Sequence, residues 1–212
     1  MIRVLPKRAL SVLVRYDDVE YYVIESQVYS PFMSRSSEKI GLLFHKLLIE
    51  DITEGLKLNS LIKIMKELNF DFLKDLDEEI DSFDKFFKII KEKNKIYLKV
   101  IENIKHAEYV LKKFGNNFTK CKKTQAFIFD LKIVGEPDLC VNDAVFEIKT
   151  RFDFKKSDII QSLVYAYLYN VNSYLLLYDV FMKNYQLLLI PISRKNFNLF
   201  INIIEKAKTF LR

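Results

Sequence analysis

Long apolar runs are missing from this sequence. No stretch approaches the roughly 18–20 uncharged apolar residues of a membrane span, because Lys, Asp or Asn interrupts every apolar run. The first 18 residues are basic and partly apolar, but Arg8 divides the apolar stretch and no small-residue cleavage site follows. We therefore expect a cytoplasmic protein that is not exported and has no membrane partner.

Cysteine is scarce as well. The 212 residues include only Cys121 and Cys140, too few for a disulfide scaffold or for a four-cysteine zinc or iron–sulfur site. The pair could be two buried strand residues or could form one disulfide, and the sequence leaves both readings open. The chain also lacks internal repeats and low-complexity tails, so nothing indicates a solenoid or a disordered arm.

The composition is that of a folded domain with a moderate positive charge. Half of the residues are hydrophobic and 29% are charged, which is enough apolar material for a core. Lys and Arg outnumber Asp and Glu by 34 to 28, a net charge of +6. Such a bias suits a polyanionic partner but is common in proteins that bind none. The length suits a single domain of residues 1–212.

The first half of the chain is expected to be mainly helical. Two β-branched and aromatic runs separated by Asp17 and Asp18 predict a hairpin over residues 2–25. Apolar residues at helical spacing then predict a helix over 37–54 that opens at Ser37, and further helices over 58–69 and 77–114. The sequence allows a break in the last of these near Asn94. Residues 55–115 would then form a helical insert.

The second half alternates between strand and helix patterns. The expected strands cover 124–134, 144–151, 173–181 and 184–190, and the expected helices cover 155–170 and 193–211. This order of elements predicts an α/β fold, with a central mixed sheet flanked by helices.

The segment richest in chemistry is Gly135-Glu136-Pro137-Asp138, followed after eight intervening residues by Glu147-Ile148-Lys149. Asn142 and Asp143 offer a tight turn between the two halves, which would make them neighbouring strands. Because side chains alternate along a strand, Glu147 and Lys149 would share one face and Ile148 would lie on the other. Pairing across the turn would bring Asp138 close to Glu147.

Two adjacent carboxylates beside a lysine suggest a metal-assisted reaction. The carboxylates repel each other, and a hard divalent cation such as Mg²⁺ or Mn²⁺ relieves that repulsion. Such an ion can deliver a water to a phosphodiester, while the lysine stabilises the developing charge. The alternative is an ordinary surface hairpin whose charges are solvated or paired across the strands.

The order of these motifs resembles that of the PD-(D/E)XK nuclease superfamily. Gln161 and Tyr165 match the Q-x-x-x-Y element of its RecB-like branch, and Gly41 and His45 match the G-x-x-x-H element. The resemblance covers residues 41–165 and implies a restriction-endonuclease-like fold. In length and in the general character of its sequence the chain is also similar to small nucleases of crenarchaeal spindle-shaped viruses. A protein of that kind would be located in the host cytoplasm.

The resemblance also implies roles for individual residues. Asp138, Glu147 and the carbonyl of Ile148 would bind Mg²⁺ or Mn²⁺, with His45 as a further ligand. Lys149 would be the catalytic lysine. Gln161 and Tyr165, four residues apart on one helix face, would contact the active site or the DNA backbone. No iron–sulfur cluster is expected. Without the resemblance, a histidine beside an apolar helix face is more often structural.

The expected partner is DNA. Arg151, Lys155 and Lys156 follow the catalytic lysine closely and could neutralise phosphates, so that binding would weaken as salt rises. Exonuclease, structure-selective endonuclease and junction resolvase remain open, and a resolvase would require a symmetric homodimer. The alternative to a nuclease is a non-catalytic DNA-binding or assembly protein on the same scaffold.

Three further polar residues match no motif, and we expect them to be solvated at the surface: Glu50, Asp51 and His106.

Overall fold

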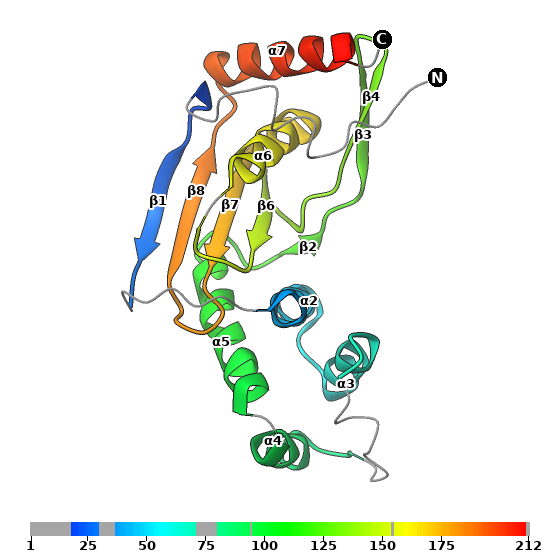
Figure 1. The fold of residues 1–212 in the computed structure, drawn as a ribbon, viewed down its shortest axis with the longest axis vertical. Helices are drawn as coiled ribbons and strands as arrows, with labels where there is room; N and C mark the ends of the chain where they lie inside the picture. The colour runs from blue at the N-terminus through cyan, green and yellow to red at the C-terminus, as the bar shows by residue number, and fades with distance from the viewer. Residues whose placement is uncertain (1–17, 30–36, 71–79, 94, 154, 211–212) are drawn as a thin grey trace.

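In the computed structural model, a mixed six-stranded sheet lies between two layers of helices (Figure 1). The structure describes residues 18–29, 37–70, 80–93, 95–153 and 155–210. Among them are six helices: α2 (Glu38–Glu54), α3 (Leu58–Glu67), α4 (Phe83–Lys93), α5 (Lys95–Lys112), α6 (Lys156–Tyr169) and α7 (Arg194–Phe210). The predicted α/β fold with flanking helices is confirmed.

The strand order across the sheet is β1-β8-β7-β6-β5-β2. These strands are β1 (Tyr22–Gln27), β2 (Thr119–Lys120), β5 (Leu139–Val141), β6 (Ala144–Lys149), β7 (Asn172–Tyr178) and β8 (Tyr185–Ile190). The pair β6–β7 is parallel and is connected through α6, while the other neighbours are antiparallel. A parallel pair needs such a crossover, and here the crossover helix covers the strands that carry the candidate site.

Both faces of the sheet are buried, so the central strands are almost continuously apolar. In β7, Leu176 and Tyr178 pack against α2 and α5, whereas Leu175 and Leu177 pack against α6 and α7. Figure 1 shows α6 across one face of the sheet, with α3 and α4 at the far end of the molecule. The segment expected as an insert is thus mixed: α5 covers part of the sheet, whereas α3 and α4 extend away from it.

Helix α2 begins where its sequence predicts. Ser37 is the N-cap, and its hydroxyl accepts a hydrogen bond from the backbone N–H of Ile40 at 3.3 Å. The apolar stripe of the helix, including Leu43, Phe44 and Leu47, is fully buried in the core shared with α5 and the sheet. Because this face is held against the sheet, His45 is carried to one end of β6.

Some predicted boundaries are wrong. The single strand expected over 124–134 is a separate antiparallel hairpin of β3 (Thr124–Ile128) and β4 (Leu131–Gly135). Its two turn residues, Phe129 and Asp130, both have positive φ, which is typical of a type I′ turn. Phenylalanine is rare in such a turn, so the sequence did not reveal it.

The helical segment expected over 77–114 is two helices, α4 and α5, which are separated at the break that the sequence allowed near Asn94. The short strand β2 had not been predicted, whereas β5 is the strand that the turn at Asn142 and Asp143 predicted beside β6. The first strand of the hairpin expected at 2–25 lies outside the described residues, and its second half forms β1, which pairs with β8.

Two further features bear on the sequence expectations. Cys121 and Cys140 form a disulfide, which joins β5 to the segment after β2. No helix of the described residues is long and apolar enough to cross a membrane.

Candidate active site

A tight hairpin between β5 and β6 brings Asp138 to Glu147. Leu139 pairs with Phe146, and Val141 pairs with Ala144 across the turn, where Asn142 adopts a positive φ of 48°. This register places Asp138 at the end of the hairpin, where its Oδ2 accepts a hydrogen bond from the backbone N–H of Ile148 at 2.7 Å. The proximity predicted from the spacing of the two motifs is confirmed.

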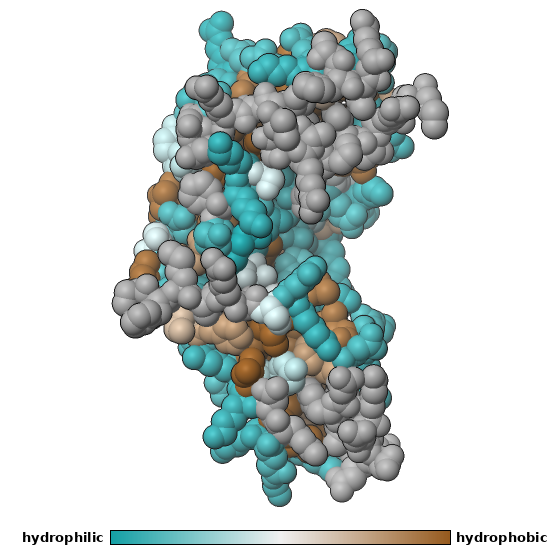
Figure 2. All heavy atoms as spheres, in the orientation of Figure 1, coloured by the Kyte–Doolittle hydropathy of each residue, from teal (hydrophilic) through white to brown (hydrophobic). Residues whose placement is uncertain are grey.

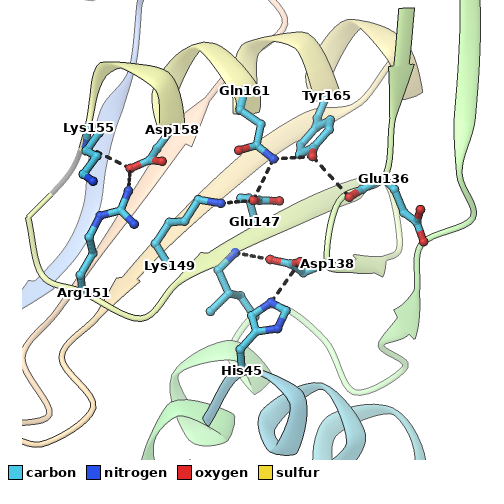
Figure 3. Close-up of polar contacts among 11 residues, drawn as sticks. His45, Glu136, Asp138, Glu147, Lys149, Arg151, Lys155, Asp158, Gln161 and Tyr165 are labelled. Atoms are coloured by element: carbon cyan, nitrogen blue, oxygen red, sulfur yellow. Dashed lines mark hydrogen bonds and ion pairs between the residues drawn. The ribbon is translucent and has the colours of Figure 1, made fainter. Parts of the chain in front are cut away.

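Glu147 is the buried centre of the site, with 4% of its surface exposed. The ammonium of Lys149 forms an ion pair with its Oε1. The amide of Gln161 donates a hydrogen bond of 2.9 Å to the same oxygen and also donates to the hydroxyl of Tyr165 (Figure 3). A carboxylate at this depth requires such partners, and α6 supplies one of them through Gln161.

Tyr165 connects this network to the loop before Asp138. Its hydroxyl donates to the backbone carbonyl of Glu136 at 3.3 Å, and its side chain is largely buried. Burial raises the pKa of Tyr165 well above its usual value, and the charge of Glu147 raises it further. The phenol therefore stays protonated and acts as a hydrogen-bond donor that ties α6 to the Glu136 loop.

His45 reaches the site from α2 on the opposite side. Its Nε2 lies 3.1 Å from Oδ1 of Asp138. Burial disfavours the charged imidazolium, but the hydrogen bond to Asp138 and the charges of Asp138 and Glu147 outweigh burial and raise the pKa of His45. The structure therefore brings the residues of all four sequence motifs together, from α2, the β5–β6 hairpin and α6.

The three predicted DNA-binding residues differ in their surroundings. Arg151 forms an ion pair with the buried Asp158 and also donates to the carbonyl of Asp153 at 3.1 Å. Lys155 is exposed at the edge of the site, while its backbone N–H donates to Asp158 Oδ2 at 2.9 Å. Lys156 is exposed in the first turn of α6 and does not line the cleft.

Asp158 was not predicted to matter. It is the third residue of α6, where its carboxylate caps the free backbone N–H of Lys155 and also holds the guanidinium of Arg151. An acidic residue in the first turn of a helix was the sequence signal that could have identified it.

The candidate site opens into a cleft with a volume of about 860 Å³. The cleft lies between the start of α2, the end of β6 and the loop that leads into α6, and polar side chains are prominent around the middle of the molecule (Figure 2). His45, Asp138, Glu147 and Lys149 lie along it, and Arg151 and Lys155 lie at its rim. Because the cleft is open and not enclosed, it can accept a segment of an extended chain.

No family model, curated protein or solved structure matches this chain. The geometry of the cleft is therefore the main guide to a function.

The donor set suits a hard divalent cation in its chemistry, with two carboxylates, a backbone carbonyl and an imidazole at one cleft. In the arrangement described, however, no group of three His, Cys, Asp or Glu side chains surrounds a common point. Asp138 engages His45 and the N–H of Ile148, and Glu147 engages Lys149 and Gln161. A cation would therefore bind carboxylates that already have partners, Lys149 at Glu147 and His45 at Asp138.

Proposed function

We propose that this protein is a Mg²⁺- or Mn²⁺-dependent nuclease that hydrolyses phosphodiester bonds in DNA, of the RecB-like branch of the PD-(D/E)XK superfamily. The observation that carries the proposal is the meeting of Asp138, Glu147, Lys149 and His45 in one open cleft, although they come from separate elements. Burying Glu147 beside a second carboxylate is costly to stability, which is typical of a site whose charges are used.

The ion would be held by Asp138, Glu147 and the carbonyl of Ile148, with His45 as a further ligand. When bound, a divalent cation polarises the phosphate and makes water a stronger nucleophile. In the overall reaction, the water oxygen forms a bond to phosphorus and the bond from phosphorus to the leaving sugar oxygen breaks. The attacking water loses a proton, and the leaving sugar oxygen gains one.

The chain's own residues would stabilise and orient this reaction. Lys149 ends in the cleft, so its ammonium can move from Glu147 to a non-bridging phosphate oxygen and neutralise the charge that develops there. Gln161 keeps Glu147 in place through the 2.9 Å hydrogen bond. Tyr165 is a positioning residue, because it touches Gln161 and the Glu136 carbonyl and does not line the cleft.

Lys155 is the residue best placed to bind the DNA backbone, since it is exposed at the cleft rim. Arg151 can join it only if a phosphate competes with Asp158 for the guanidinium. We therefore expect a modest, salt-dependent affinity for DNA from this side of the cleft.

The test is cleavage of labelled single-stranded, duplex, flap and four-way-junction DNA with Mg²⁺, Mn²⁺ or EDTA. We expect cleavage that requires the metal and that falls about 100-fold or more in Glu147→Gln, which keeps the shape but removes the charge. Glu136→Gln is the matched control, because Glu136 is exposed and its carboxylate points away from the cleft (Figure 3). Equal rates for Glu147→Gln and the wild type would refute the site assignment.

The non-catalytic alternative predicts a different result. The ion pair between Lys149 and Glu147 would then be a permanent structural feature, and Mg²⁺ or Mn²⁺ would bind poorly in calorimetry. Among cleaved substrates, a preference for the four-way junction would require a symmetric dimer, which sedimentation measures directly.

A further inference from the structure

A second, smaller hollow adjoins the active cleft at His45. Its volume is about 330 Å³, and it lies between α2, α3 and β2. Its lining residues are His45, Lys46, Ile49, Glu50, Ser60, Lys63, Ile64, Glu67 and Lys120. Because His45 lines both hollows, a strand lying in the cleft at Asp138 could extend a neighbouring group into the second one.

The hollow has an apolar floor and a charged rim. Ile49 and Ile64 are buried and supply the apolar surface. At the rim, Lys46 pairs with Glu67 at 3.0 Å, and Lys120 pairs with Glu50 at 3.3 Å.

The protonation of Glu50 is governed by its neighbours on both sides of the hollow. The pKa of Glu50 is lowered, first by a hydrogen bond from the hydroxyl of Ser60 and then by Lys120, with a smaller contribution from the charge of Lys63. Glu50 therefore presents carboxylate oxygens, which only accept hydrogen bonds. The same surface offers ammonium groups, which only donate.

This combination suits a nucleotide better than a phosphate alone. An apolar floor can contact the face of a base, as aliphatic side chains do in many ligand pockets. The carboxylates can accept from the exocyclic amino group of a base, as Glu and Asp do with cytosine. The lysines can neutralise the phosphate attached to it. A volume of about 330 Å³ is within the range of sites for single small ligands, so the hollow has room for one nucleotide.

We propose that this hollow binds one unpaired nucleotide of the substrate strand, next to the phosphate that the active cleft holds. The inference rests on the proposed nuclease function and deepens it, because it specifies the substrate as DNA that is single-stranded at this position. A base in a duplex would first have to leave its stack and its partner, which costs a few kcal/mol. Single strands and flaps meet that requirement without the cost.

The test blocks the hollow and measures DNA binding in EDTA, so that no cleavage occurs. Ser60→Trp places an indole in the hollow, and Asn59→Trp is the matched control, because Asn59 is the exposed neighbour on α3 and does not line it. With a fluorescent single-stranded oligonucleotide, we expect Ser60→Trp to weaken binding about tenfold and Asn59→Trp to leave it unchanged. Duplex binding should be unaffected by both. Ser60→Leu, a smaller obstruction, should give a smaller loss, and urea unfolding checks that each variant is folded.

The outcomes separate this inference from the nuclease proposal. Equal binding of the single strand by Ser60→Trp and the wild type overturns the inference, as does tighter wild-type binding to duplex or no DNA binding at all. If Ser60→Trp and the wild type cleave single strands at the same metal-dependent rate, the inference is overturned and the nuclease proposal is retained. Weakened single-strand binding by Ser60→Trp, with no cleavage of any substrate by the wild type, supports the nucleotide site and refutes the nuclease.

Discussion

At the residue scale, the candidate site depends on a close approach between β4 and α6. A Cβ atom at Gly135 would lie 2.6 Å from Cδ1 of Leu168 and 2.9 Å from Cδ1 of Tyr165. These distances are too short for any side chain, so glycine is required here for space and not for a special backbone angle. The contact seats Tyr165 so that its hydroxyl reaches the Glu136 carbonyl.

Gly135→Ala is therefore expected to displace the Tyr165 ring and with it Gln161. We expect the free energy of unfolding to fall by about 1–3 kcal/mol, the usual cost of overpacking. Cleavage should fall as well, since Gln161 holds Glu147. Urea denaturation and the cleavage assay measure the two effects. If Leu168→Ala is introduced with Gly135→Ala, part of the crowding is relieved, and the two changes should cost less together than their sum. Strict additivity would contradict the explanation.

At the element scale, the disulfide joins two segments that the short β2–β5 ladder alone would hold weakly. β2 has two residues and β5 has three, and Cys121 and Cys140 are 19 residues apart in sequence. The bond connects the end of β2 to the strand that leads from Asp138 into the hairpin. A crosslink of this span restricts the unfolded chain more than the folded one.

Cys121→Ser/Cys140→Ser is expected to lower the free energy of unfolding by about 3 kcal/mol, as a loop of this length implies. Urea unfolding with and without a reductant measures the change. The reductant should destabilise the wild type by a similar amount and leave the double variant unaffected. If the reductant changes both proteins equally, the stabilisation does not come from this bond.

At the scale of the whole molecule, buried polar groups join segments that are distant in the sequence. His106 of α5 was expected at the surface, but its Nδ1 lies 2.9 Å from the hydroxyl of Tyr178 in β7, and its Nε2 lies 3.1 Å from that of Tyr29. Asp51 was also expected to be solvated, yet it is buried and pairs with Lys105 of α5 at 2.8 Å. Both expectations were wrong, because α5 packs directly against α2 and the sheet.

His106 should make stability depend on pH. Burial lowers its pKa below the usual value, and the charges of Lys183 and Lys113 lower it further, while Glu25 partly opposes them. The unfolded chain then binds the proton more readily, so stability falls as the pH drops below the unfolded pKa of about 6.5. His106→Gln removes this titration, and its free energy of unfolding should decline less between pH 7 and pH 5.5. Urea unfolding at the two pH values measures the difference.

His45 provides the internal comparison, because its pKa is raised and its effect has the opposite sign. The stability that it contributes is present below the unfolded pKa and is lost as the pH rises through the folded value. In His106→Gln, His45 is the one remaining histidine. A steeper loss of stability on acidification in His106→Gln than in the wild type would contradict the assignment for His106.

The sequence by itself determined the features that depend on neighbours in the chain. Helical spacing and a serine cap were enough to locate α2, and strand alternation with a two-residue turn was enough to bring Asp138, Glu147 and Lys149 together. Because Gln161 and Tyr165 are four residues apart, the sequence was enough to place both on one face of α6. Each of these follows from local geometry, which a pattern of a few residues expresses directly.

The tertiary structure alone decided the features that depend on contact between distant segments. It paired Cys121 with Cys140 and engaged Arg151 with Asp158. It buried Asp51 beside Lys105 of α5 and brought the half-buried His106 of α5 against Tyr178 of the sheet. It also formed the hollow beside His45 from the consecutive helices α2 and α3 and the distant strand β2. Such contacts depend on how amphipathic faces pack against one another, and the hydrophobic pattern marks each face without specifying its partner.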